Sequence, residues 1–308
     1  MTGELLALLG AAAFGAGNVS ARMGMRTSAT DNGMFMTVII NLITTVPWAI
    51  AHTLTSPHLP PLSMRIVLLF VAAGSLTTLL GRWSLFASIR RIGPGRTGVY
   101  KITSPVFASL FALAILRESL DIWAMAGVLI VLVSLWYFSV QIGRSYSSQA
   151  ESAAAGELGR VGSNQLGIGL SLLSAASFGL GHVFRKIGLE AFPSAPFGAA
   201  IGSSVSMTVI LALTIKEGRL RQLIRENFHK LPVYFVASGV FTTMGMILQF
   251  LALLSAPVTI VTILTATEGL FTIFLGALFI GSEERITFPL FLSAVTTTLG
   301  VAIIILYG

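Results

Sequence analysis

Ten runs of about 20 mostly apolar residues follow one another along the chain. A helix needs about 20 such residues to cross the hydrocarbon core of a bilayer, whereas the strands of a membrane barrel are about half as long and alternate in polarity. These runs do not alternate, so the sequence predicts an all-α membrane protein with ten transmembrane helices. The predicted helices cover residues 4–25, 33–53, 65–88, 97–116, 122–142, 166–187, 195–215, 232–254, 257–280 and 287–306.

Composition agrees with a membrane protein. Hydrophobic residues make up 55% of the 308 residues and charged residues 10%, whereas a soluble domain carries about 25% charged residues. The net charge of +7 comes mostly from short connections between the apolar runs, so it does not indicate a nucleic-acid partner. The absence of cysteine excludes disulfides and thiolate chemistry. The opening "MTGELL" has no basic region or cleavage site, so we expect the first run to be a retained span.

The second half of the chain repeats the first. "LALLGAAAFGAGNVSARMGM" (Leu6–Met25) returns as "LSLLSAASFGLGHVFRKIGL" (Leu170–Leu189), and "FVAAGSLTT" (Phe70–Thr78) returns as "FVASGVFTT" (Phe235–Thr243) at almost the same offset. Each half holds five spans, and because five is odd the second half must enter the membrane from the opposite side. Inverted repeats of this kind are typical of secondary transporters. The predicted units are a first repeat over 1–142, a flexible Ser/Gly/Ala-rich linker over 143–165 and a second repeat over 166–308.

Small residues recur every seven positions in both copies of the opening segment. Such a stripe lets a neighbouring helix backbone approach closely. The stripes are Gly10, Gly17 and Gly24 in the first copy and Ser174, Gly181 and Gly188 in the second.

Charge gives one orientation of the spans. The odd-numbered connections hold far more Lys and Arg than the even-numbered ones, which places the odd connections in the cytoplasm and both termini outside. One odd connection, Lys216–Lys230, has an apolar stripe and is read either as a basic amphipathic helix on an anionic leaflet or as a solvated loop helix.

The region Ser84–Phe138 resembles the EamA domain of the drug/metabolite transporter superfamily. Its run "SPVFASLFA" contains Pro105, and "RESL" places Glu118 at the start of the connection to span 5. In the second half Glu283 or Glu284 supplies the acidic residue, but "TATEGLF" stands where a proline is expected. The resemblance implies a central cavity surrounded by spans 1–4 and 6–9, with spans 5 and 10 peripheral. It also implies cytoplasmic termini, against the charge count.

Glu268 lies about 11 residues inside span 9, near the bilayer centre. A carboxylate at that depth costs several kcal/mol unless it is paired or protonated. Thr265, Glu268 and Thr272 share one helix face. The hypothesis is that Glu268 couples transport to protons or binds a cationic group of a substrate, and the alternative is a structural glutamate that ties two helices together.

Other intramembrane polar residues are candidates for substrate binding. Lys101 and Arg82 are interpreted as an anchor for a substrate carboxylate, as an ion pair with Glu268 in one transport state, or as side chains that snorkel to the interface. Trp83 and Tyr100 beside them are interpreted as walls of a binding pocket or as residues of the interfacial aromatic belt. Asn18 and His182 are equivalent positions at which the repeats differ, and His182 is a further candidate for proton transfer. The remaining two candidates are Asn41 and Gln249, which are expected either to bind substrate or to bridge helices. Glu118, Glu283 and Glu284 are expected to orient helix ends or loops.

No enzyme motif is recognisable. The sequence has no HExxH pair and no GxxxxGK[ST] loop, so we expect no metal, no cofactor, no catalysis and no ATP-driven transport. The prediction is a secondary transporter that moves a small amphoteric or anionic metabolite, such as an amino acid, by alternating access. Alternatives are a flippase for lipids or lipid-linked head groups, an exporter of cationic drugs or quaternary amines, and a non-transporting membrane subunit. We expect a monomer or homodimer among the lipids of a prokaryotic inner membrane, with the substrate and protons as partners.

Overall fold

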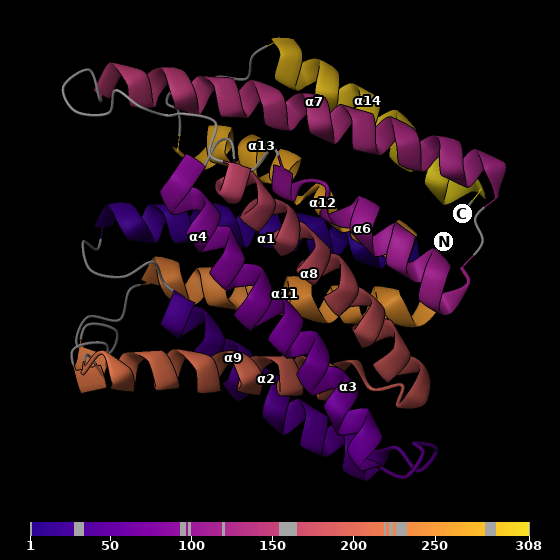
Figure 1. Cartoon of the computed structure of the whole chain (residues 1–308). Coiled ribbons are helices and arrows are strands. Elements are labelled where there is room, and N and C mark those ends of the chain that lie inside the picture. Colours follow the sequence, from indigo (N-terminus) through magenta and orange to yellow (C-terminus); the bar gives the residue numbers. More distant parts are fainter. Residues whose placement is uncertain are drawn as a thin grey trace.

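The computed structural model describes residues 2–27, 34–92, 97, 100–118, 121–153, 165–218, 220–221, 224–225, 233–280 and 288–307. Every regular element within these ranges is helical, which confirms the all-α class (Figure 1). The elements of the first half are α1 (Thr2–Thr27), α2 (Met34–Thr55), α3 (Met64–Ser75), the π-helical turn η1 (Leu76–Gly81), α4 (Arg82–Ile92), α6 (Ser104–Phe111), the π-helical turn η2 (Ala112–Leu116) and α7 (Ile122–Ala153). Those of the second half are α8 (Gln165–Ala191), α9 (Ala195–Lys216), α11 (Val233–Ser255), α12 (Val258–Ala266), α13 (Glu268–Ile280) and α14 (Phe288–Tyr307).

Seven helical segments of the described residues are long and apolar enough to cross a membrane. Three shorter apolar helices, Ser104–Leu116, Ile122–Tyr137 and Ala294–Tyr307, fall where the other predicted spans lie. The protein is therefore a multi-pass membrane protein, and the count of ten spans stays a prediction.

Two connections differ from the sequence expectation or fall outside what is described. Helix α7 continues to Ala153, well into the segment 143–165 that is expected to be a flexible linker. Ala, Gln and Glu in this stretch favour helix, and adding residues to an existing helix is far easier than starting one. Most of Lys216–Lys230, together with Glu283 and Glu284, lies outside the described residues.

The small-residue stripes pack as predicted, and they pack in the same way in both halves. A Cβ on Gly17 would lie 2.8 Å from the hydroxyl oxygen of Thr242, and a Cβ on Gly181 would lie 2.6 Å from the methyl group of Thr77. Thr77 and Thr242 are equivalent positions of the repeated segments "FVAAGSLTT" and "FVASGVFTT". The close approach of α1 to α11 is therefore repeated by α8 and the α3–η1 segment.

The two equivalent helices α1 and α8 run in opposite directions (Figure 1). Gly3 at the start of α1 contacts Ala256, since an added Cβ would lie 2.7 Å from the Ala256 Cβ. Lys186, near the end of α8, also reaches Ala256, with its Nζ 3.3 Å from the carbonyl oxygen. We call this side of the bundle, where both ends of the chain lie, the termini end.

Helices α7 and α14 pack chiefly against each other at the edge of the bundle (Figure 1). The Ser134 hydroxyl lies 2.7 Å from Thr296 Oγ1 and 2.8 Å from Thr297 Oγ1, and Gly127 faces the carbonyl oxygen of Gly300. Their peripheral position agrees with what the family resemblance implies for spans 5 and 10.

Glu118 caps α12 at the termini end. Its carboxylate accepts hydrogen bonds from the backbone nitrogens of Val258 (2.7 Å) and Thr259 (3.3 Å) and from the Thr259 hydroxyl (3.3 Å). A carboxylate at a helix N-terminus satisfies free N–H groups and complements the helix dipole. This confirms the expectation that Glu118 orients a helix end.

Lys186 holds the other side of the same turn. Its Nζ donates to the carbonyl oxygens of Leu253 (2.7 Å) and Ala256 (3.3 Å), which end α11. Helix α12, which follows the turn, is buried from Val258 to Thr265. The turn Ser255–Pro257 is thus fixed by a cation from α8 and an anion from the segment before α7.

Candidate functional site

Charged side chains from both halves of the chain gather between α4, α8, α13 and the residues before α6. Lys101 interacts electrostatically with Glu268 and with Arg82. Arg185 interacts with Arg82, and His182 interacts with both Arg185 and Lys101. We call these five residues the charged cluster: Arg82, Lys101, His182, Arg185 and Glu268.

All five side chains of the charged cluster are partly exposed, although four of them belong to apolar helices and Lys101 comes just before another. Charged groups within a membrane protein are expected to face a polar cavity or the bundle interior rather than lipid. The cluster contains three cationic side chains and one carboxylate, so it is electropositive. It is therefore suited to hold an anion, or a molecule with one negative and one positive group.

Arg185 is fixed by α11. Its Nη1 donates to Gln249 Oε1 at 3.1 Å, and its guanidinium carbon lies 5.1 Å from the centroid of the Phe250 ring. A guanidinium group held by an amide and an aromatic face keeps its remaining N–H donors in a defined direction. Gln249 thus positions Arg185 in this structure, and its predicted role as a substrate ligand stays a prediction.

Sequence reasoning missed Arg185 because it counted the residue among the charges of a connection. The signal was available, since Arg185 follows His182 by three positions and the two therefore share a helix face. Helix α8 continues beyond both residues to Ala191, so Arg185 lies within the helix and not in the loop after it.

Lys101 faces the aromatic side chain of α8. Its Nζ lies 4.5 Å from the centroid of the Phe178 ring. Within the described residues the carboxylate of Glu268 makes no hydrogen bond, and its charge is balanced by Lys101 through electrostatics alone. The carboxylate is thus free to accept a proton or a hydrogen bond from a bound molecule.

Both helices that carry these two residues are interrupted beside them. Thr103 and Thr267 adopt nearly the same backbone conformation (φ −75°, ψ −3° and φ −67°, ψ −5°), and each hydroxyl donates to the carbonyl three residues earlier at 2.6 Å. Helices α6 and α13 then begin at the next residues, Ser104 and Glu268. Two half-helices therefore start at the charged cluster, and such N-termini carry partial positive charge.

A π-helical turn precedes Arg82. The wider turn η1 ends at Gly81, whose carbonyl oxygen accepts a hydrogen bond from Ser174 Oγ of α8 at 2.7 Å. The same carbonyl oxygen also accepts a hydrogen bond from Ser84 Oγ at 3.2 Å. Turns of this kind are frequent at functional sites.

Asn18 and His182 occupy matching places but have different contacts. Asn18 Nδ2 donates to Thr272 Oγ1 of α13 at 3.3 Å, and the Asn18 side chain is exposed. His182 Nδ1 is buried and has no hydrogen-bond partner in the described part of the chain. Asn18 thus reaches the helix that begins with Glu268, and His182 lies beside the cations.

The other three sequence candidates are not brought into the charged cluster. Asn41 Oδ1 accepts a short hydrogen bond from Thr243 Oγ1, which ties α2 to α11. The Trp83 side chain is 62% exposed, the placement expected of an aromatic ring at the lipid surface. Tyr100 is partly buried, and its carbonyl oxygen accepts the Thr103 hydroxyl. Their roles in binding remain predictions.

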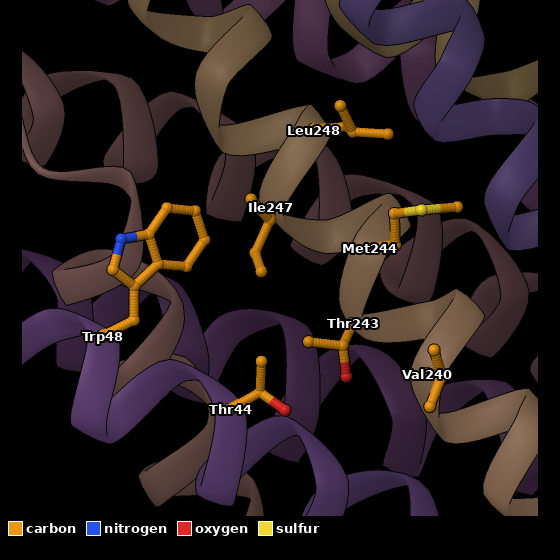
Figure 2. Close-up of a pocket in the computed structure, with 7 residues that line it drawn as sticks. All are labelled: Thr44, Trp48, Val240, Thr243, Met244, Ile247 and Leu248. Atoms are coloured by element: carbon orange, nitrogen blue, oxygen red, sulfur yellow. The ribbon is translucent and has the colours of Figure 1, made fainter.

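A second concave feature lies between α2 and α11. It is a groove of about 340 Å³, lined by Thr44, Trp48, Val240, Thr243, Met244, Ile247 and Leu248. Figure 2 shows Trp48 of α2 facing Ile247 of α11 across the groove. Its lining contains no charged residue, so it is chemically different from the charged cluster.

A family profile described as the EamA-like transporter family matches residues 1–140 and 165–306, which together make up most of the chain. The chain belongs to this family. The match in two segments agrees with a protein built from two EamA repeats, and the family suggests a membrane transporter of the drug/metabolite transporter superfamily. Transporters of the EamA family are generally not enzymes, which agrees with the absence of catalytic motifs.

Comparison with other proteins adds the fold. A solved structure, described as the crystal structure of a protein, superposes with a TM-score of 0.66 over 98% of this chain and 96% of that chain. The two sequences are 14% identical, so the likeness shows a shared fold alone. No curated protein sequence matches the chain. Within the described residues no group of His, Asp and Glu is suited to hold a metal ion.

Proposed function

We propose that this EamA protein is a secondary active transporter with ten spans in two inverted repeats, and that it moves a small anionic or amphoteric metabolite by alternating access. The observation that carries the proposal is the charged cluster, in which packing brings together three cations and one carboxylate from four segments. Such a cluster complements a substrate carboxylate or phosphate and leaves Glu268 for a proton or a substrate ammonium group. The two half-helix N-termini at the cluster add further positive potential.

The packing of the bundle supports alternating access. At the termini end, α12 is buried and the α11–α12 turn is held by Glu118 and Lys186. The side chains of the charged cluster are nevertheless partly exposed, and we infer that the cluster opens at the opposite end. Helices α1 and α8 run in opposite directions, as expected for inverted repeats. In such a protein the two halves can exchange the closed and the open arrangement, which moves the opening to the other side of the membrane.

The alternatives fit the charged cluster less well. A purely cationic drug would meet three positive side chains and one carboxylate, and a non-transporting subunit has no need for charges inside its helices. A lipid-linked substrate would favour an apolar side opening that leads to the cluster, whereas the lining of the α2–α11 groove contains no charged group.

Thermal stabilisation of the purified protein by ligands tests the substrate class. Glutamate, betaine and choline represent anionic, amphoteric and cationic solutes. We expect the first two classes to raise the melting temperature and choline to have no effect, since only a bound ligand stabilises the folded state. Stabilisation by choline alone would contradict the proposal.

Arg185→Gln is expected to weaken the binding of a stabilising ligand at least tenfold, about 1.4 kcal/mol. The reason is the loss of one positive charge and of the guanidinium donors that Gln249 holds in place. Titration of ligand-induced stabilisation measures the affinity, and Lys216→Gln, which removes an exposed cation at the end of α9, is the matched control. Equal affinities for both variants would place binding elsewhere.

Glu268→Gln tests proton coupling. In proteoliposomes we expect the variant to lose substrate accumulation driven by a pH gradient while it retains exchange of substrate across the membrane, because the amide cannot carry a proton between the two sides. The proton-coupling role is lost if accumulation under the gradient is the same in both proteins.

A further inference from the structure

The lining of the α2–α11 groove offers no charged group to a charged metabolite. Its walls lie in the middle of two candidate spans, Phe35–Thr55 and Val233–Ser255, so the groove is at the depth of the hydrocarbon core. The residues around it are apolar and exposed, including Ile43 (65%) and Val240 (52%). A charged substrate would have to lose its hydration there without gaining any charged partner.

The two helices meet tightly on one side of the groove and separate on the other. A Cβ on Gly239 would lie 2.5 Å from the terminal methyl carbon of Ile40, so the backbones are close there. One turn on, Thr243 bonds Asn41, and this bond turns the threonine's polar group away from the groove. Beyond it, Trp48 and Ile247 form the walls of a concave, apolar space (Figure 2).

We propose that this groove binds one acyl chain of a membrane lipid at a defined site. Its volume of about 340 Å³ lies within the range of ligand pockets, about 300–1,000 Å³. The surrounding bilayer supplies acyl chains at this depth, and the apolar lining matches their chemistry. The bound chain fills the space between α2 and α11 that no side chain fills. The site is separate from the charged cluster and does not depend on the identity of the transported substrate.

Fluorescence of Trp48 tests the proposal. The chain has four tryptophans, and the other three, Trp83, Trp123 and Trp136, are 54–62% exposed, so their replacement by phenylalanine is mild. The Trp48-only protein is reconstituted in phosphatidylcholine vesicles with increasing fractions of phosphatidylcholine brominated on its acyl chains. A Trp136-only protein, with its tryptophan on the outer face of α7, is the reference.

We expect quenching of Trp48 to rise linearly with the fraction of brominated lipid, since a single bound chain covers it, whereas Trp136, which several chains surround, reaches half of its maximal quenching at a lower fraction. Val240→Phe, which fills the groove, is expected to remove that difference, whereas Val133→Phe on the exposed face of α7 keeps it. Identical quenching curves for Trp48 and Trp136 overturn the proposal by showing ordinary lipid contact. Absence of Trp48 quenching also overturns it and indicates that a second copy of the chain covers the groove.

Discussion

Gly179→Ala is expected to destabilise the protein by about 1–3 kcal/mol, the usual cost of overpacking a filled interface. A Cβ at this position would lie 2.7 Å from the backbone nitrogen of Ala108 and 3.0 Å from the carbonyl carbon of Phe107. Because both atoms belong to the backbone of α6, no side-chain rotation relieves the contact. Helices α6 and α8 must move apart, close to the charged cluster.

The chain supplies a control for this substitution on the same helix. A Cβ on Gly169 meets nothing within 4 Å, so Gly169→Ala is expected to be neutral or slightly stabilising. Gly15 is the equivalent of Gly179 in the first repeat, and its Cβ would lie 2.7 Å from the Phe271 Cβ and 3.0 Å from the Thr272 nitrogen. Gly15→Ala should therefore be as harmful as Gly179→Ala.

Thermal unfolding in detergent measures these differences. One kcal/mol corresponds to a shift of about 2–4 °C in the melting temperature of a chain of 150–250 residues, and a somewhat smaller shift is expected here. If Gly179→Ala and Gly169→Ala melt at the same temperature, the close contact between α6 and α8 is not a feature of the native protein.

Glu118→Ala is expected to open the termini end of the bundle. The substitution removes the acceptors of three hydrogen bonds at the start of α12, and the loss of a helix cap alone costs about 0.5–2 kcal/mol. The chain has no cysteine, so Thr262→Cys places a single thiol in the buried part of α12. We expect a membrane-impermeant thiol reagent to modify this cysteine at least tenfold faster in the Glu118→Ala background.

Two controls separate opening from other effects. Glu190→Ala removes an exposed carboxylate near the same end of the bundle and should leave the rate unchanged. Ser203→Cys, buried in α9, should stay protected in the Glu118→Ala protein, because only the α11–α12 turn is released. Fast modification of both introduced thiols would mean general unfolding, and slow modification of the thiol in α12 would mean that Glu118 does not hold the turn closed.

Much of the fold follows from local sequence. A helix that crosses a bilayer must satisfy its backbone internally and present apolar side chains along its length, so the spans can be read from the chain residue by residue. The repeated opening segment predicted that the small residues of α1 and α8 pack closely against a neighbouring helix. The structure confirms this, and these residues contact equivalent positions of "FVAAGSLTT" and its copy in the two halves. The extension of α7 to Ala153 could not be read in this way, because Ser, Ala and Gln suit a helix and a linker equally.

Only some residues of the candidate site could be predicted from the sequence. Lys101 and Glu268 were recognised because a charge deep in an apolar run is rare. Arg185 was missed because hydropathy at a helix end does not distinguish a residue that faces the bundle from one that faces water. For Trp83 and Asn41 the sequence left two readings open. The structure shows that the rotation of α4 exposes Trp83 and that Thr243 binds Asn41 from a helix about 200 residues away in the chain, and their roles in binding stay predictions.

The sequence by itself determined that this chain is a multi-pass helical membrane protein made of two related halves, since hydrophobic length and repetition are properties of the chain alone. The tertiary structure decided which charges meet, because Arg82, Lys101, Arg185 and Glu268 lie on segments whose rotation is set by packing against the other half. It also decided that Glu118 and Lys186 fix one turn and that α2 and α11 enclose an apolar groove. The direction of a side chain around its helix axis is set by packing against neighbours that are distant in sequence. For this reason the sequence predicted the helices, whereas only the tertiary structure showed which side chains meet.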